Sequence, residues 1–223
     1  MEAQAEVGVS YRIKIMKKSI FKIISLILSI VLFVPLTSSC SKLERDEVVT
    51  IAAELIEKSY EINEIFYGEG LPLNEWDLER VKANYENGVY SSVGIPPYVT
   101  VSDECEYTCI DDIKEAARAV YTESYCSGMF EAAFEGIRGG GGVFYYARYI
   151  ENDLGYLAMK YDAAGSAYEL SRTYDMESLL IDKQTSSYVT FTVDSYVDGV
   201  LSDPVQLKIT STPSGWRLDT PTY

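Results

Sequence analysis

The hydrophobic pattern of the chain changes its period near residue 143, and this change constrains the fold more than any other feature. Before it, apolar side chains recur every three or four residues, which is typical of amphipathic helices. After it, apolar and polar residues alternate, which is typical of strands with one buried face. A helical half followed by an antiparallel meander predicts an α+β domain, because the helices must cover the apolar face of the sheet.

Three main helices are expected in the first half. Gly68 ends the first helix, and Gly136 ends the third. The spacing of Thr108 and Asp111 resembles a capping box at the start of the second helix, with Asp in place of Glu. The expected bounds are 45–67, about 108–120 and about 124–135 for these helices, 76–81 for a further short helix and 98–101 for a short strand.

The second half predicts a curved antiparallel sheet of about five or six strands, with one face buried. Its clearest strand is 188–197, where Val189, Phe191 and Val193 share one face. Asp198 and Gly199 follow as a tight hairpin turn. The expected strand segments are 143–150, 155–161, 168–175, 176–183, 188–197, 205–209 and 216–219.

A different signal occupies the N-terminal part of the chain. Lys17 and Lys18 precede an apolar run that ends at Leu36, and small residues then lead to Cys40. This order is typical of a secretory signal peptide. Residues 16–18 are typical of its start, so residues 1–15 are expected to precede the true start. The predicted division is a signal peptide over 1–39, a short tether over 40–44 and one domain over 45–223.

A cysteine placed directly after small residues resembles the lipobox of bacterial lipoproteins. The resemblance implies that Cys40 is S-diacylated, becomes the mature N-terminus and anchors the protein at the extracytoplasmic face of the cell membrane. The family prefers Leu three residues before the cysteine, where this chain has Thr37. Secretion without a lipid and a retained helix are the alternatives, although the charge-free stretch 23–36 is shorter than the roughly 18–20 residues that cross a bilayer.

The order of elements over residues 45–223, the text of residues 59–70 and the closing residues 215–219 resemble uncharacterised exported lipoproteins with a nuclear transport factor 2-like domain. The resemblance implies a cone, formed by a bent sheet and its helices, with a pocket between them. A lipocalin-like barrel and an α/β sandwich are the competing folds.

The acidic charge narrows the classes of partner. The chain has a net charge of −15, and the predicted signal peptide holds five of its 19 basic and two of its 34 acidic residues. Residues 40–223 therefore carry a net charge of −18. Such a surface repels phosphate backbones, so nucleic acid is not an expected partner. It also repels anionic lipids, so the expected membrane contact is through acyl chains alone.

The chain lacks the residues of the common catalytic motifs. It contains no histidine, which excludes Ser-His-Asp and Cys-His catalysis. The glycine run 139–142 lacks the Lys and Ser/Thr of a phosphate loop. Cys105, Cys109 and Cys126 are too few for a typical zinc site, and they allow at most one internal disulfide, whose pairing stays open. No metal and no cofactor are expected.

Two functions from different classes remain. The first is a non-enzymatic binding or accessory protein that engages a small molecule, a peptide or an envelope protein, and the missing motifs favour it. Tyrosines and arginines on the strands suit such binding, and the candidate ligand-binding residues are Tyr146, Arg148, Arg172, Tyr174 and Asp194. The alternative is an isomerase, dehydratase or hydrolase with a lone carboxylate base, for which the candidates are Asp194, Asp182 and Glu61.

Overall fold

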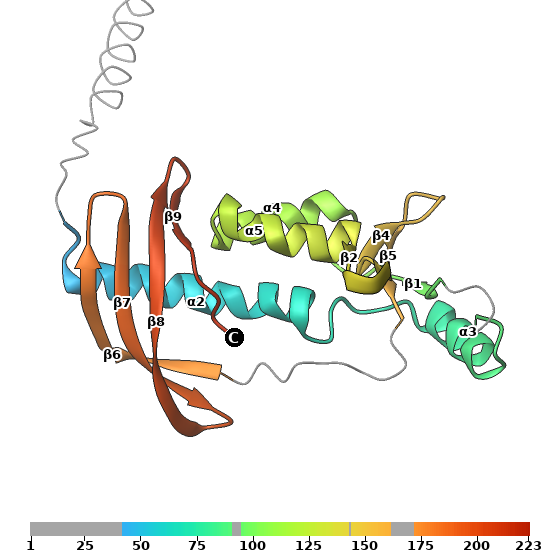
Figure 1. Cartoon of the computed structure of the whole chain (residues 1–223), viewed down its shortest axis with the longest axis horizontal. Coiled ribbons are helices and arrows are strands. Elements are labelled where there is room, and N and C mark those ends of the chain that lie inside the picture. Colours follow the sequence, from blue (N-terminus) through green and yellow to red (C-terminus); the bar gives the residue numbers. More distant parts are fainter. Residues whose placement is uncertain (1–41, 91–94, 143, 162–171) are drawn as a thin grey trace, which may run out of the picture. The chain divides into compact units, whose positions relative to one another are not determined.

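The structure is a computed structural model of the chain, and it describes residues 42–90, 95–142, 144–161 and 172–223. The predicted signal peptide, Cys40 and residues 168–171 of a predicted strand lie outside the described residues. Residues Lys42–Tyr223 form one unit with helices first and antiparallel strands after them (Figure 1), which confirms the α+β class. Within the described ranges, no helix combines the length and the apolar character needed to cross a bilayer.

The helices lie close to their predicted positions. The first predicted helix is α2, and the short helix predicted over 76–81 is α3, which is longer than expected. The predicted capping box at the start of α4 is wrong by one residue, because Cys109 is the N-cap and Asp112, not Asp111, accepts the backbone N–H groups of Thr108 and Cys109. The bounds are α2 Arg45–Tyr67, α3 Glu75–Glu86, α4 Ile110–Val120 and α5 Glu123–Phe130, which continues as a π-helical turn over Glu131–Glu135.

The described strands form three antiparallel sheets, whereas one sheet of five or six strands was predicted. The sheet orders are β1-β5-β4, β2-β3 and β6-β7-β8-β9. The predicted strand 143–150 divides because β3 pairs with β2, whereas β4 pairs with β5. The bounds are β1 Tyr98–Thr100, β2 Ile137–Arg138, β3 Phe144–Tyr145, β4 Tyr149–Glu151, β5 Leu157–Lys160, β6 Arg172–Gln184, β7 Tyr188–Val197, β8 Val200–Thr212 and β9 Gly215–Leu218.

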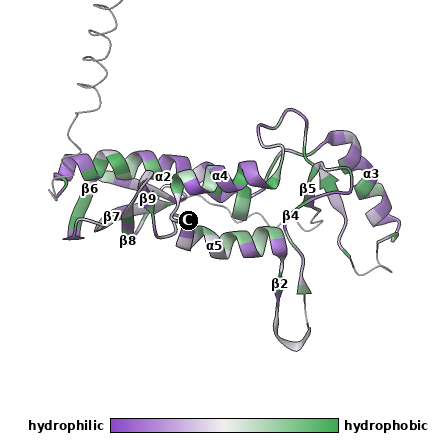
Figure 2. Cartoon of the chain, turned by 90° about the horizontal axis from the view of Figure 1, so that it is seen from above, coloured by the Kyte–Doolittle hydropathy of each residue, from purple (hydrophilic) through white to green (hydrophobic). Residues whose placement is uncertain are grey.

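The core lies between α2 and the inner face of the four-stranded sheet. Val189, Phe191 and Val193 are at most 1% exposed, so the predicted alternation along β7 is confirmed. Seen from above, α2 carries hydrophobic residues beside a hydrophilic face (Figure 2). The apolar residues of α2 that join this core are Val48, Ala52, Leu55, Ile56, Ile62, Ile65 and Phe66. The pocket that the resemblance implies between the sheet and the helices stays a prediction.

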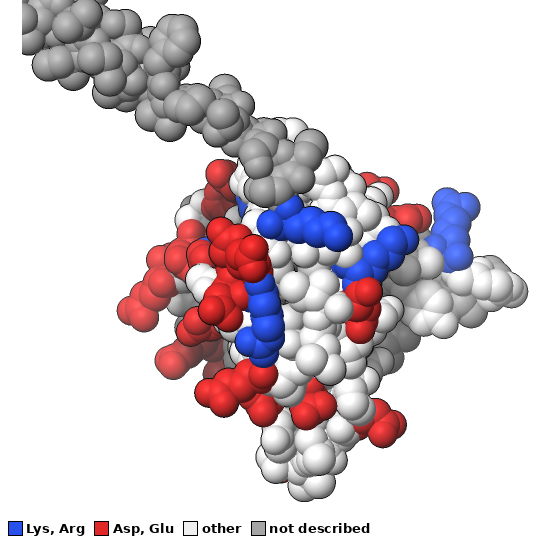
Figure 3. Space-filling view, turned by 90° about the vertical axis from the view of Figure 1, so that its left-hand side faces the viewer, with Lys and Arg blue, Asp and Glu red and all other residues white. Residues whose placement is uncertain are grey.

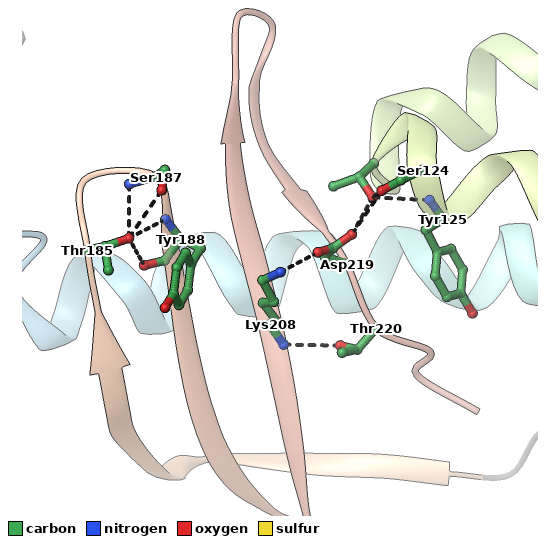
Figure 4. Close-up of polar contacts among 9 residues, drawn as sticks. Ser124, Tyr125, Thr185, Ser187, Tyr188, Lys208, Asp219 and Thr220 are labelled. Atoms are coloured by element: carbon green, nitrogen blue, oxygen red, sulfur yellow. Dashed lines mark hydrogen bonds and ion pairs between the residues drawn. The ribbon is translucent and has the colours of Figure 1, made fainter.

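Asp219 joins the four-stranded sheet to the connection between α4 and α5. Its carboxylate accepts hydrogen bonds from Lys208 Nζ at 2.6 Å and from Thr122 Oγ1 at 2.6 Å. Figure 4 shows this carboxylate between Lys208 of β8 and Ser124 of α5. Burial raises the pKa of Asp219, but the hydrogen bonds from Lys208 and Thr122 outweigh it and hold that pKa below its ordinary value.

Val193→Asp is expected to unfold the domain, because the new carboxylate would be buried on the inner face without a partner. The expected loss in the free energy of unfolding is at least ~4 kcal/mol, measured by urea denaturation. Thr190→Asp is the matched control, since Thr190 lies on the outer face between Lys183 and Lys208 and should cost less than ~1 kcal/mol. Similar losses for both variants would contradict the assignment of faces.

A buried carboxylate, Asp77, attaches α3 to β1. Its Oδ2 accepts hydrogen bonds from Thr100 N at 2.8 Å and Thr100 Oγ1 at 3.0 Å, and its Oδ1 accepts one from Arg80 Nε at 2.9 Å. Burial raises the pKa of Asp77, but these bonds and the charge of Arg80 outweigh it, so the pKa is lowered. The ionised form is therefore the one that stabilises the folded state.

Asp77→Asn is expected to lower the free energy of unfolding by about 2 kcal/mol at pH 7, because hydrogen bonds to a charged acceptor are lost. The folded-state pKa lies below the unfolded value, so this stabilisation is complete above about pH 4 and is lost as the pH falls further. Urea denaturation at pH 7 and at pH 3 should show the difference shrinking. Glu79→Gln on the exposed side of α3 should have little effect at either pH.

Candidate functional site

A groove of about 450 Å³ lies where the C-terminal end of α2 meets the loop 102–108. A second hollow of about 230 Å³ adjoins it and shares Cys105 and Tyr107. The volume of the groove lies within the range of small-molecule sites. Its lining residues are Glu61, Glu64, Ile65, Gly70, Leu71, Pro72, Glu104, Cys105, Glu106 and Tyr107.

The turn that follows α2 forms one wall of the groove, and β4 holds it in place. Gly68 ends the helix, and Arg148 Nη2 donates to its carbonyl oxygen at 2.6 Å. Tyr149 OH donates to Ile65 O at 2.8 Å. Gly70 has a φ of +91°, and a Cβ there would collide with Met159 and Arg148. This wall therefore requires a glycine, and its position depends on contacts from a distant strand.

Carboxylates form the rim of the groove. Glu61, Glu64, Glu104 and Glu106 line it, and no Lys or Arg does. Among the described residues, none of these four carboxylates has a basic nitrogen within 4.0 Å. The backbone N–H of Glu69 donates to Glu64 Oε1 at 2.6 Å, so Glu64 also closes the turn. Pro72 is an exposed apolar residue of the lining, so the groove combines negative charge with apolar surface.

Tyr107 links the two sides of the groove. Its hydroxyl donates to Glu61 Oε1 at 2.6 Å, which ties the loop 102–108 to α2. Burial, and then the neighbouring carboxylates of Glu61 and Glu106, raise the pKa of Tyr107. The phenol therefore stays protonated at neutral pH and acts as a hydrogen-bond donor.

The five predicted ligand-binding residues do not come together in one site. Tyr146 packs edge-on against Phe144 at a centroid distance of 5.0 Å, and Arg148 supports the turn after α2. Arg172 and Tyr174 begin β6 and share the inner face with Ser195, and Arg172 Nη1 donates to Ser195 Oγ at 2.7 Å. Asp194 lies on the outer face.

Of these five, Arg148 comes nearest to the groove. Its Nη2 would be 2.8 Å from a Cβ at Gly70, directly behind one wall. Its Nε is buried without a hydrogen-bond partner in the described part of the chain, and so is the hydroxyl of Tyr174. Tyr174 packs against the core rather than against the groove. A role for these residues in ligand binding stays a prediction.

The three candidate bases are not placed as a buried catalytic carboxylate would be. Asp182 is exposed and accepts hydrogen bonds from Thr192 Oγ1 at 2.8 Å and Gln206 Nε2 at 3.0 Å. Asp194 is half-buried on the outer face, and Glu61 is exposed on the rim of the groove. The buried carboxylate of the described residues, Asp77, is paired with Arg80. This arrangement does not support a lone base whose pKa is raised by burial.

The three described cysteines form neither a disulfide nor a metal site. Cys105 and Cys109 are half-buried, Cys126 is buried, and all three thiols are free. Burial raises the pKa of the Cys126 thiol to about 11, so this cysteine is inert packing. Across the described ranges, no cluster of three or more His, Cys, Asp or Glu residues is arranged to hold a metal ion.

Comparisons of the chain with known protein families, with curated proteins and with solved structures give no match.

The sequence identified one residue of this groove, Glu61, and missed the others. Glu104 and Glu106 lie about 40 residues further along the chain, in a loop without a recognisable motif. The available signal was compositional: two of the three residues that flank Cys105 and Tyr107 are glutamates, in a segment without basic residues.

Proposed function

We propose that the chain is a lipid-anchored, extracytoplasmic binding protein whose groove takes a positively charged small molecule or peptide. The observation that carries this proposal is the groove itself, which has four carboxylates on its rim and no basic residue in its lining. The exposed apolar residue of its lining, Pro72, favours a ligand whose charged group is attached to a short hydrocarbon body.

The charge of the whole domain supports the same ligand class. Acidic side chains gather along one side of the face that Figure 3 shows. With a net charge of −15 over the chain, the long-range field attracts cations and repels anions. Rim carboxylates in water each contribute roughly 0.2–1 kcal/mol to binding, so the affinity is expected to be modest and to fall with added salt.

The lipid anchor rests on the sequence pattern that ends at Cys40. The domain begins with α2 at Arg45, so the proposed tether between the acylated cysteine and the folded domain is only a few residues long. Two acyl chains suffice for stable attachment, since each buried methylene contributes about 0.8 kcal/mol. The protein would thus be held at the membrane without a basic contact surface.

Replacing three rim carboxylates, Glu61→Gln, Glu104→Gln and Glu106→Gln, is expected to weaken binding of a polyamine probe at least ten-fold in isothermal titration calorimetry. Three losses of ~0.5 kcal/mol each account for this factor. Glu64 is left intact because it closes the turn after α2. The matched control carries the same change of charge on exposed residues that do not line the groove: Asp203→Asn, Glu131→Gln and Glu177→Gln. Equal weakening in both triple variants would show that only net charge matters and would refute the groove.

Cys40→Ala is expected to move the protein from the membrane fraction to the soluble fraction, because the proposed acylation site is lost. Mass spectrometry of the wild-type protein should find a diacylated Cys40 as the N-terminal residue. Ser41→Ala, one residue further on, should leave the fractionation unchanged. Unaltered membrane partitioning of the Cys40 variant would refute lipid anchoring, and it would leave the groove hypothesis standing.

A further inference from the structure

A small polar cluster interrupts the apolar interior beside α2. Ser59, Asn63 and Tyr121 are each at most 1% exposed, and their side chains converge on the hydroxyl of Thr222. Thr222 Oγ1 lies 2.7 Å from Ser59 Oγ, 2.8 Å from Asn63 Nδ2 and 3.0 Å from Tyr121 OH. Tyr121 OH also donates to Asn63 Oδ1 at 2.8 Å, which fixes the orientation of the amide. Ser59, Asn63 and Tyr121 thus form a polar socket around Thr222 Oγ1.

Tyrosine rings lie beside this socket. The ring of Tyr223 lies 4.4 Å from that of Tyr67, centroid to centroid, and Tyr121 stacks on Tyr125 at 4.6 Å. Burial, and then the neighbouring Tyr223, raise the pKa of both Tyr67 and Tyr125. The residues 222 and 223 are therefore recognised in two ways: a hydroxyl in a polar socket, and an aromatic ring against tyrosine.

Residues 220–223, which fill this site, are held by their side chains. The last backbone–backbone bond before them joins the N–H of Asp219 to Lys208 O at 2.8 Å, and Thr220 Oγ1 then accepts from Lys208 N at 3.0 Å. The backbone of residues 221–223 makes no hydrogen bond to the part of the chain that the structure describes. Pro221 and Tyr223 are exposed, and the segment runs over α2 without regular secondary structure (Figure 1). Segments with so few backbone bonds are among the first to open locally.

Opening the site has a defined cost. Without Thr222, Asn63 Nδ2 would lose its hydrogen-bond acceptor in the described part of the chain, and a buried unsatisfied group costs roughly 1–3 kcal/mol. Ser59 Oγ would still donate to Ile56 O, and Tyr121 OH would still donate to Asn63 Oδ1. A water molecule at this position would offset part of this cost, and a ligand that places a hydroxyl oxygen there would offset more of it. The site therefore favours an occupant that brings an oxygen into the socket and an aromatic ring beside Tyr67.

We propose that this site is a peptide-binding site for an extended segment with a hydroxyl residue followed by an aromatic one, and that residues 220–223 are its exchangeable resident occupant. A ligand peptide gains access by displacing this tail. The site uses Ser59, Asn63 and Tyr67 of α2 and Tyr121 and Tyr125 near α5, and the proposal does not depend on the acidic groove or on the lipid anchor.

The test uses a peptide with the sequence of residues 220–223, blocked at both ends so that terminal charges play no part. It is titrated against the wild-type chain and against a variant that lacks residues 220–223. In the wild-type chain the tethered tail competes at an effective concentration of about millimolar. The peptide is therefore expected to bind the shortened variant at least ten-fold more tightly and to raise its melting temperature. A control peptide with Val in place of Thr222 should bind at least ten-fold more weakly.

A second variant covers the case in which the shortened chain does not fold. Thr222→Val in the complete chain removes the hydroxyl and keeps the shape, so the tail should be held less tightly and the peptide should bind this variant more tightly than wild type. The proposal would be overturned by no binding to a folded shortened chain or by equal affinity of the Thr and Val peptides. Where the shortened chain is unfolded, equal affinity of the peptide for wild type and for Thr222→Val would overturn it. Concentration-dependent dimerisation that is lost in Thr222→Val would also overturn it, because the occupant would then come from a second copy.

Discussion

The packing of α2 is the constraint on which the remaining structure depends. Its apolar face contributes to the core together with the inner face of the sheet β6–β9, and it also contacts α4. Tyr149 of β4 donates to Ile65 O, and Arg148 donates to Gly68 O, so the last turns of the same helix position the three-stranded sheet β1-β5-β4. Apolar burial supplies the driving force, at about 25 cal/mol per Å². The hydrogen bonds then fix where each sheet lies along the helix.

The sequence predicted α2 and β7 correctly because each keeps one period along its length. Arg45–Tyr67 has apolar residues at helical spacing at both ends, and Tyr188–Val197 alternates throughout. The sequence predicted two strands, 168–175 and 176–183, where the structure has the single strand β6. The predicted boundary falls where the register of β6 with β7 shifts, between Asp175 and Leu180. There Ser178 Oγ donates to Asp175 O and accepts from Asp194 N, which spans the irregularity within one continuous strand. The division into three sheets depends on pairings between distant segments, such as β1 with β5, which local patterns do not encode.

The position of the groove could not be predicted from the sequence for a similar reason. Its two sides come from the end of α2 and from the loop 102–108, and the contact between Glu61 and Tyr107 that joins them spans 46 positions. Composition indicated an acidic protein, but a solvated acidic surface and a cation-binding groove have the same composition. The difference lies in geometry: carboxylates around a hollow with apolar lining act on one ligand together, whereas scattered ones do not.

The site that holds residues 220–223 has a sequence signal, which a search for apolar residues alone does not detect. The buried face of α2 is apolar at Leu55 and Ile62, but it carries Ser59 and Asn63 between and beside them, four positions apart on one face. A helix that only packs against a sheet has no need of two buried polar residues at this spacing, because each costs free energy unless it is hydrogen-bonded. Their presence indicates a polar contact from elsewhere in the fold, and the hydroxyl of Thr222 supplies it. Polar residues spaced by one helical turn within an apolar stripe thus locate a docking position, although they do not identify the segment that docks there.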